Sequence, residues 1–210
     1  SDVYKRQLFT QNTAYSIDMT DHGSAAASSL MTALRTTYDA SIAIGYSPLV
    51  STSIYCGDYS KQQLLWVMAG NYAVSQGEYT GAELRQMMEW LVNVKDNGAN
   101  PIRHRNYMPV TSGMEYKVTE YEQGKFRLEE LTVNGAPLDD TATYTVFVAG
   151  TDVWIENEVY CSCPMPENLK TKRTEYAIEG ADSRSCLKDS LAVSKQFPAP
   201  SEYLTIVQGE

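Results

Sequence analysis

The chain has 210 residues, of which 43% are hydrophobic and 20% charged, a balance typical of a folded globular protein and unlike that of a disordered one. Its formal net charge is −9 at pH 7, so most of its surface should repel phosphate backbones, and binding of nucleic-acid polymers is disfavoured. No apolar run approaches the roughly 20 residues of a membrane-spanning helix, and the two histidines, His22 and His104, are too few for a histidine-rich dimetal hydrolase site.

The first seven residues, Ser1–Gln7, have no hydrophobic period and no initiator methionine. Asp2–Gln7 reads DVYKRQ, which resembles a translated sequencing-adapter remnant at the end of a metagenomic fragment. We therefore predict a non-native leader over residues 1–7, with a natural polar linker as the alternative, and one domain over residues 8–210. The chain is then expected to be the tail of a longer protein, whose missing part can include an export signal.

The next stretch of the chain has a helical period. A helix is predicted over His22–Tyr38, with Asp21 or Ser24 as its cap. The apolar residues that recur there at helical spacing are Ala27, Leu30, Met31 and Leu34. A buried strand, a short helix and a second strand are predicted next, over Ala40–Ile44, Ser60–Ala69 and Tyr72–Tyr79.

The clearest helix signal begins at Thr80. Thr80 and Glu83 have the spacing of a capping box, in which the threonine hydroxyl accepts from the third backbone N–H and the glutamate reaches back. Leu84 and Leu91 bound an apolar stripe that follows, and Asp96-Asn97-Gly98 predicts the end of the helix.

After residue 100 the pattern becomes that of strands. Strands are predicted over Tyr107–Val110, Glu115–Tyr121, Phe126–Val133 and Tyr144–Ala149. The third changes its alternation phase, which predicts a bulge near Glu129–Glu130. Asn134-Gly135 predicts a tight turn, and Pro137 with Asp139-Asp140 makes the connection longer than a minimal hairpin. Asp139-Asp140 is interpreted as turn chemistry rather than as a catalytic carboxylate pair.

The last third of the chain is less regular. Glu156–Gly180 is predicted to be irregular, Asp182–Ser194 helical, and Tyr203–Val207 a closing strand or tail. Helices dominate the first half and strands the second, so the predicted fold class is α+β, a single domain with a mixed sheet flanked by helices.

Six stretches in order along residues 20–150 carry a family resemblance: Asp21–Met31, Ser41–Ile44, Gly57–Ser60, Val67–Asn71, Tyr79–Gln86, and Leu131–Asp139 with Tyr144–Val146. The fifth reads YTGAELRQ, nearly the L-T-G-A-E-L-R-Q of the family. Together they resemble the C-terminal, substrate-binding domain of the 5′-nucleotidase / UDP-sugar hydrolase / 2′,3′-cyclic-nucleotide phosphodiesterase family, and imply its fold.

The resemblance implies a division of labour between two domains. The C-terminal domain recognises a nucleotide or nucleotide-sugar, and a separate N-terminal metallophosphoesterase domain holds two divalent metals that activate water. We therefore expect this chain to carry no catalytic residue, metal or cofactor, and not to hydrolyse phosphate esters alone. Its expected partner is the N-terminal domain of a parent bacterial enzyme of nucleotide catabolism, secreted or on the cell surface.

The candidate binding residues differ from the family pattern. Where the family has N-G-G-G-I-R, this chain has Gly45–Ser51, which brings Tyr46 into the stretch and puts Ser51 at the position of the arginine. Val67–Asn71 lacks the stacking phenylalanine of V-L-P-F-G-N but keeps Asn71. In the loop that corresponds to G-G-D-G-Y, Asp152 is the expected loop aspartate, and Trp154, or Tyr160, can supply a stacking ring.

Two further features leave alternatives open. The lost arginine and ring favour, as an alternative function, a degenerate non-catalytic extracellular spacer or protein-interaction domain with the same fold. Cys56, Cys161, Cys163 and Cys186 allow three pairings; disulfides are expected in an exported protein, with four free thiols as the alternative. The basic run Arg103–Arg105 is interpreted as a solvated loop.

Overall fold

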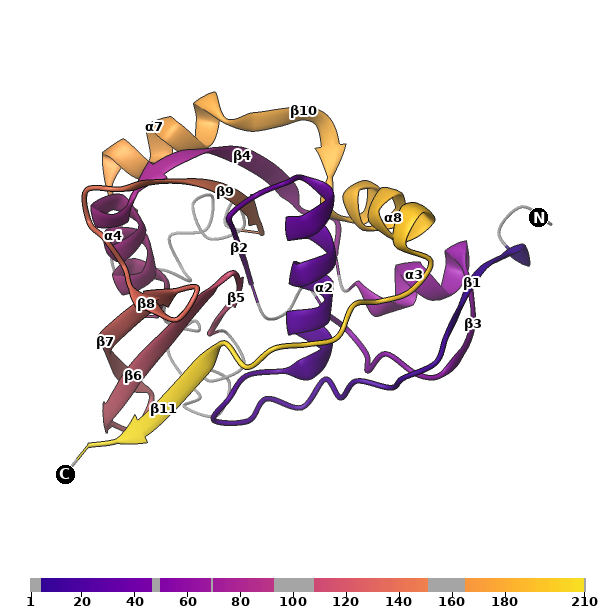
Figure 1. Ribbon diagram of the computed structural model, residues 1–210, viewed down its shortest axis with the longest axis horizontal. Coiled ribbons are helices and arrows are strands. Elements are labelled where there is room, and N and C mark those ends of the chain that lie inside the picture. The colour runs from indigo at the N-terminus through magenta and orange to yellow at the C-terminus, as the bar shows by residue number, and fades with distance from the viewer. Residues whose placement is uncertain (1–4, 47–49, 69, 93–107, 151–164, 210) are drawn as a thin grey trace.

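The computed structural model describes residues 5–46, 50–68, 70–92, 108–150 and 165–209 (Figure 1). Its helices are α2 (Ala25–Thr37), α3 (Lys61–Val67), α4 (Gly81–Val92), α7 (Glu167–Glu175) and α8 (Ser183–Ser194). Its strands are β1 (Gln7–Gln11), β2 (Ile42–Tyr46), β3 (Gly57–Ser60), β4 (Ala73–Thr80), β5 (Pro109–Ser112), β6 (Met114–Glu122), β7 (Lys125–Val133), β8 (Ala136–Pro137), β9 (Thr143–Ala149), β10 (Ala177–Asp182) and β11 (Leu204–Gln208). The α+β fold with helices around a mixed sheet is confirmed.

The central element is a five-stranded sheet in the order β10-β4-β9-β2-β5. Its middle pair, β2 and β9, is parallel, whereas the other pairs are antiparallel. Ile42 and Ile44 of β2 and Val146 and Phe147 of β9 are completely buried, as expected for strands covered on both faces. Apolar β-branched residues in this short run are what made β2 predictable.

Helix α2 packs against β2, β5 and α8 and lies in front of the sheet in Figure 1. It begins three residues later than the predicted start at His22. Gly23 has φ +97°, a backbone conformation that cannot belong to a right-handed helix, so the helix cannot extend back to His22. The Ser24 side chain accepts from the backbone N–H of Ala27 as the N-cap. The predicted serine cap is therefore confirmed, and it fixes the helix start.

A second mixed sheet has the order β11-β6-β7-β8, with β11 parallel to β6. Lys117 pairs with Glu130 and Val118 with Leu128, so Glu129 is the extra residue of the predicted bulge. Asn134 and Gly135 have positive φ and form the predicted tight turn. This turn leads into the two-residue strand β8, which was not predicted from the sequence.

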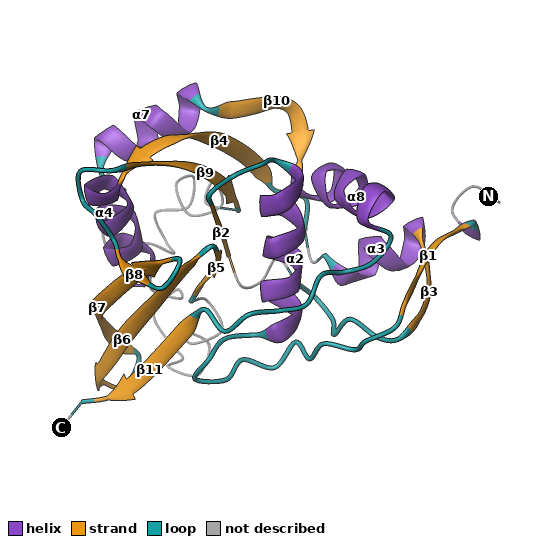
Figure 2. Cartoon of the chain, in the orientation of Figure 1, coloured by secondary structure: helices purple, strands orange, loops and turns teal. Residues whose placement is uncertain are grey.

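Two other regions also differ from the predictions. The segment predicted as irregular, Glu156–Gly180, contains α7 and most of β10 in its described part. Helix α7 buries only Leu169, so it has no apolar stripe for a periodicity argument to detect. Strands β1 and β3 form a small antiparallel ribbon beside α3, at the end of the molecule opposite β11 (Figure 2). Gln7 belongs to β1.

The predicted capping box of α4 is present and holds α7 in place. The backbone N–H of Thr80 donates to Glu83 (2.8 Å), and that of Glu83 donates to the Thr80 hydroxyl (3.2 Å). Lys172 of α7 donates to the same Glu83 carboxylate at 2.6 Å and lies 5.4 Å from the centre of the Tyr79 ring. A polar helix is thus fixed by a largely buried ion pair instead of by an apolar face.

Glu83→Gln removes the ion pair with Lys172 but keeps the helix cap, because glutamine also serves in a capping box. We expect a loss of about 1–2 kcal/mol in the free energy of unfolding for Glu83→Gln, and about 2–4 kcal/mol for Glu83→Ala, which removes the cap as well. Glu130→Gln removes the exposed pair with Lys117 and should cost less than about 0.5 kcal/mol. Urea unfolding measures all three, and equal losses for Glu83→Gln and Glu130→Gln would contradict the assignment.

The same ion pair predicts a dependence on pH. Burial acts to raise the pKa of Glu83, but hydrogen bonds from Lys172 and Thr80 outweigh it and lower that pKa below its ordinary value of 4.5. A lowered folded pKa stabilises the protein above the unfolded pKa, and this contribution is lost as the pH falls through the folded value. Unfolding measured from neutral pH down to about pH 3 should therefore show the gap between wild type and Glu83→Gln closing in acid.

Candidate functional site

Three segments of the chain meet at one edge of the five-stranded sheet. Because β2 and β9 are parallel, with Ile44 opposite Val148, they end at the same edge. Strand β4 is antiparallel to β9 and starts there, with Val74 opposite Ala149. The ends of β2 and β9 and the start of β4 therefore lie together, at the carboxyl ends of the parallel pair, where ligands commonly bind in α/β sheets.

Ser51 and Met68 tie two of these segments together. Val50 forms an antiparallel bridge with Met68, and the backbone N–H of Ser51 donates to the Val67 carbonyl at 2.8 Å. The Ser51 hydroxyl makes a short hydrogen bond to the carbonyl of Trp66. Ser51, which the resemblance aligns with an arginine, is therefore a neutral side chain whose donor is already used by the last turn of α3.

Asn71 is exposed and lies at the same edge, just before β4. Its side chain hydrogen-bonds to the carboxylate of Asp182, which is the N-cap of α8 and accepts from the backbone N–H of Ser185 at 2.7 Å. Burial acts to raise the pKa of Asp182, but hydrogen bonds from Ser185, Asn71 and Arg184 outweigh it and lower that pKa. Asn71 is thus oriented by a charged helix cap.

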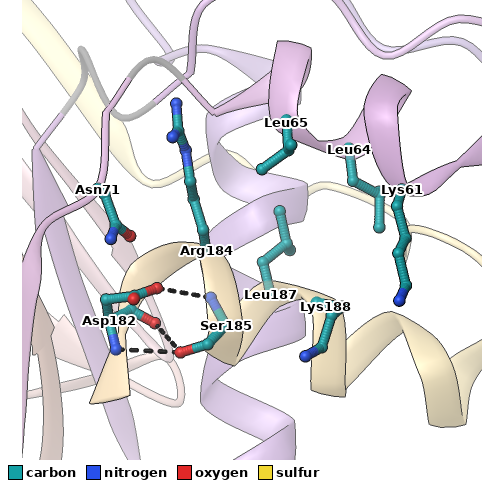
Figure 3. Close-up of a pocket in the computed structure, with 9 residues that line it drawn as sticks. All are labelled: Lys61, Leu64, Leu65, Asn71, Asp182, Arg184, Ser185, Leu187 and Lys188. Atoms are coloured by element: carbon teal, nitrogen blue, oxygen red, sulfur yellow. Dashed lines mark hydrogen bonds between the residues drawn. The ribbon is translucent and has the colours of Figure 1, made fainter. Parts of the chain in front are cut away.

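Asn71 also lines an open pocket of about 380 Å³ between α3 and α8 (Figure 3). The other described residues that line it are Lys61, Leu64, Leu65, Asp182, Arg184, Ser185, Leu187 and Lys188. The helix that starts at Asp182 was predicted from the sequence, but none of these other lining residues was assigned to a site. The Asp182–Ser185 spacing could have identified the cap, whereas no local pattern indicated the pocket.

The remaining candidates are only partly placed. Tyr46 ends β2 with its backbone opposite Pro109, which puts it at the same edge as Asn71 and Ser51. Asp152, Trp154 and Tyr160 lie outside the described residues, as do Arg103–Arg105 and the predicted end of α4. Their roles in binding stay predictions.

The acidic pair Asp139-Asp140 and the cysteines Cys56 and Cys186 can be checked against the structure. Asp139 accepts from the backbone N–H and the hydroxyl of Thr141, and Asp140 pairs with Arg85 at 2.8 Å, so the interpretation as turn chemistry is confirmed. Cys56 is an exposed free thiol and Cys186 a buried one. The expectation of a disulfide is therefore wrong for these two residues, while Cys161 and Cys163 lie outside the described part.

Side chains that could bind a metal do not cluster in the described ranges. Within residues 5–46, 50–68, 70–92, 108–150 and 165–209, no three His, Cys, Asp or Glu side chains gather closely enough to hold a metal ion. None of the helices described there is long and apolar enough to span a membrane.

Comparison with known proteins identifies the fold. A family model described as the 5′-nucleotidase C-terminal domain matches residues 6–151. No curated protein sequence matches significantly. Among solved structures, a 5′-nucleotidase precursor from Thermus thermophilus has a TM-score of 0.70 at 16% identity, covering 100% of this chain and 41% of its own. The NAD nucleotidase of Haemophilus influenzae has a TM-score of 0.74 at 12% sequence identity, covering 100% of this chain and 39% of its own.

The sulfate thiohydrolase of Thermus thermophilus has a TM-score of 0.65 at 15% identity, covering 98% of this chain and 36% of its own. At these identities the likeness is one of fold alone. This chain spans about two fifths of the length of the solved chains that it matches.

Asp182→Ala tests whether the helix cap supports the site edge. Losing an N-cap carboxylate should lower the free energy of unfolding by about 1–2 kcal/mol and leave the Asn71 amide without its described acceptor. Asp189→Ala is the control, because Asp189 is exposed and pairs only loosely with Lys188, at 3.6 Å. Urea unfolding and the amide NMR signals of the Asn71 side chain measure the two effects; identical behaviour of the two variants would contradict the proposed coupling.

Proposed function

The chain belongs to the 5′-nucleotidase C-terminal domain family, and from that premise we propose that it is the substrate-recognition domain of a secreted bacterial 5′-nucleotidase-like metallophosphoesterase. Its ligand is a nucleotide or nucleotide-sugar, and its parent protein acts in nucleotide catabolism, outside the cell or at the cell surface. The observation that supports the proposal is that the ends of β2 and β9 and the start of β4 lie at one edge of the sheet, where we expect Tyr46, Ser51 and Asn71 to contact the ligand.

The catalytic half of the proposed enzyme is an N-terminal metallophosphoesterase domain of the same parent chain. The length of the matched structures supports this, since this chain aligns with only 36–41% of theirs. Two divalent metals in that domain would polarise the phosphoryl group and activate water. In this proposal the present chain binds the ligand and orients it next to those metals.

The binding residues are expected to act through contacts that need no arginine. Asn71 offers an amide held by Asp182, and Trp154 is proposed as the ring that stacks on the base, with Asp152 as a polar contact. Because Ser51 supplies no cation, the ligand phosphate should add little to the affinity. The domain should then distinguish poorly between a nucleoside and its monophosphate.

The use of the Ser51 hydroxyl by the Trp66 carbonyl also favours a second candidate function. In this alternative the domain keeps the fold as a non-catalytic extracellular spacer or protein-interaction module. Calorimetric titration of the 210-residue chain with adenosine, AMP and UDP-glucose separates the two. Binding of any of them supports recognition, and silence of all three at millimolar concentration overturns it in favour of the spacer.

Ser51→Arg should restore the cation at the family position. We expect AMP to bind about tenfold more tightly than to wild type, since a charge-assisted hydrogen bond is worth about 1.5–3 kcal/mol, whereas adenosine binding should not change. Val193→Arg adds the same charge at a position on α8 that is 83% exposed and serves as the control. Equal gains for AMP and adenosine would show that residue 51 does not face the ligand phosphate.

A further inference from the structure

The pocket between α3 and α8 is cationic in an acidic protein. Its lining includes Lys61, Arg184 and Lys188 against one carboxylate, Asp182, although the whole chain has a net charge of −9. A concentration of one charge sign in a concave site raises the local concentration of ligands of the opposite sign. The pocket is therefore suited to an anion.

The single carboxylate, Asp182, offsets one of these three charges, but its hydrogen bonds are made with groups other than the cationic side chains. Asp182 accepts from the Ser185 backbone N–H at 2.7 Å as the cap of α8 and from the Asn71 side chain. Among the ion pairs of the described residues, Lys188 has a partner, Asp189 at 3.6 Å. The described part of the chain offers neither Lys61 nor Arg184 a carboxylate within salt-bridge distance.

Arg184 is the more constrained of these two cations. It is half-buried, and its Nη2 donates to the Met68 carbonyl at 3.3 Å. Its Nε is buried and has no hydrogen-bond partner among the described groups. A half-buried guanidinium with an unused donor is costly unless an acceptor is available, and guanidinium geometry matches a carboxylate or phosphate head.

The lining residues are arranged along the pocket (Figure 3). Arg184 and Asn71 lie at one end, and Lys61 lies at the other, near Lys188. Between the two ends lie three leucines, Leu64, Leu65 and Leu187. The order is thus cation, apolar wall, cation.

We propose that this pocket binds a small elongated organic dianion with an apolar middle, such as an α,ω-dicarboxylate. One acidic group binds Arg184, beside the Asn71 amide, the methylenes pack on the leucines, and the other acidic group binds Lys61. Two negative charges match Arg184 and Lys61, the two cations that have no carboxylate partner among the described residues, and 380 Å³ is within the usual range of about 300–1,000 Å³ for small-molecule pockets.

This site shares Asn71 with the proposed nucleotide-binding edge, but Arg184 and Ser51 lie on different sides of the segment that joins α3 to β4. Ser51 binds the Val67 carbonyl, whereas Arg184 binds the next one, that of Met68. Met68 has extended backbone, with φ −99° and ψ 118°, and successive carbonyls of extended backbone point to opposite sides. Arg184 and Ser51 therefore flank opposite sides of this segment, and the inference goes beyond the proposed function.

The test is a calorimetric titration of the 210-residue chain with straight dicarboxylates from succinate to sebacate, and with octanoate. A dicarboxylate of intermediate length should bind about tenfold or more tightly than octanoate, because only the dianion pairs both cations. Arg184→Gln and Lys61→Gln should each weaken that dicarboxylate about tenfold and leave octanoate less affected. Arg85→Gln is the matched control on the far surface, where Arg85 pairs with Asp140.

Several outcomes would overturn the proposal. Equal affinity for octanoate and for every dicarboxylate would show that the pocket does not select a ligand with two acidic groups. Unchanged dicarboxylate binding in Arg184→Gln would show that Arg184 does not bind an acidic group. If Arg184→Gln proves unfolded by circular dichroism, Lys61→Gln and the charge-preserving Arg184→Lys carry the test. AMP titrated into Lys61→Gln should bind as in wild type, so a failure of the dianion site is distinguishable from a failure of nucleotide recognition.

Discussion

Strands β2 and β9 run side by side in the same direction through the centre of the five-stranded sheet, with Ile42 opposite Val146. A parallel pair cannot be joined by a short turn, and here almost a hundred residues separate the two strands in sequence. The burial of their apolar side chains stabilises a pairing of such long range. The position of the candidate binding edge depends on this pairing, because it puts two strand ends and the start of β4 together.

The short segment Val67–Met68 lies between Ser51 on one side and Arg184 on the other. On one side its backbone is hydrogen-bonded to Ser51, whose side chain is a neutral hydroxyl. On the other side Arg184 contacts the next carbonyl and faces a pocket with further cations. The chain therefore has positive charge close to the site edge, but on helix α8 instead of after β2. The proposed recognition of a nucleobase ring would use one side of this backbone segment, and the proposed binding of a dianion would use the other.

Local sequence patterns predicted those features that depend on nearby residues. Ser24 and Thr80 identified helix starts, because a cap is made within one turn, and the phase change around Glu129 identified a bulge. Helix α7 escaped detection because its position depends on Lys172 binding Glu83, 89 residues away. Arg184 escaped for the same reason: its partner Met68 lies 116 residues earlier. Contacts between such distant residues carry no periodic signal in either segment.

The C-terminal segment that leads into β11 is hydrogen-bonded to α2, and α2 packs against the five-stranded sheet. The backbone N–H of Ser24 donates to the Tyr203 hydroxyl at 3.0 Å, and the Ser28 and Ser29 hydroxyls donate to the carbonyls of Ser201 and Pro198. Helix α2 is thus bound to the segment that leads into β11, while its other contacts are with β2, β5 and α8. Because α8 carries Arg184 and β2 ends at the candidate nucleotide edge, both sites belong to the same packed body. A ligand that orders α8 can therefore affect the nucleotide edge through α2, through the Val67–Met68 segment, and through the hydrogen bond between Asp182 and Asn71.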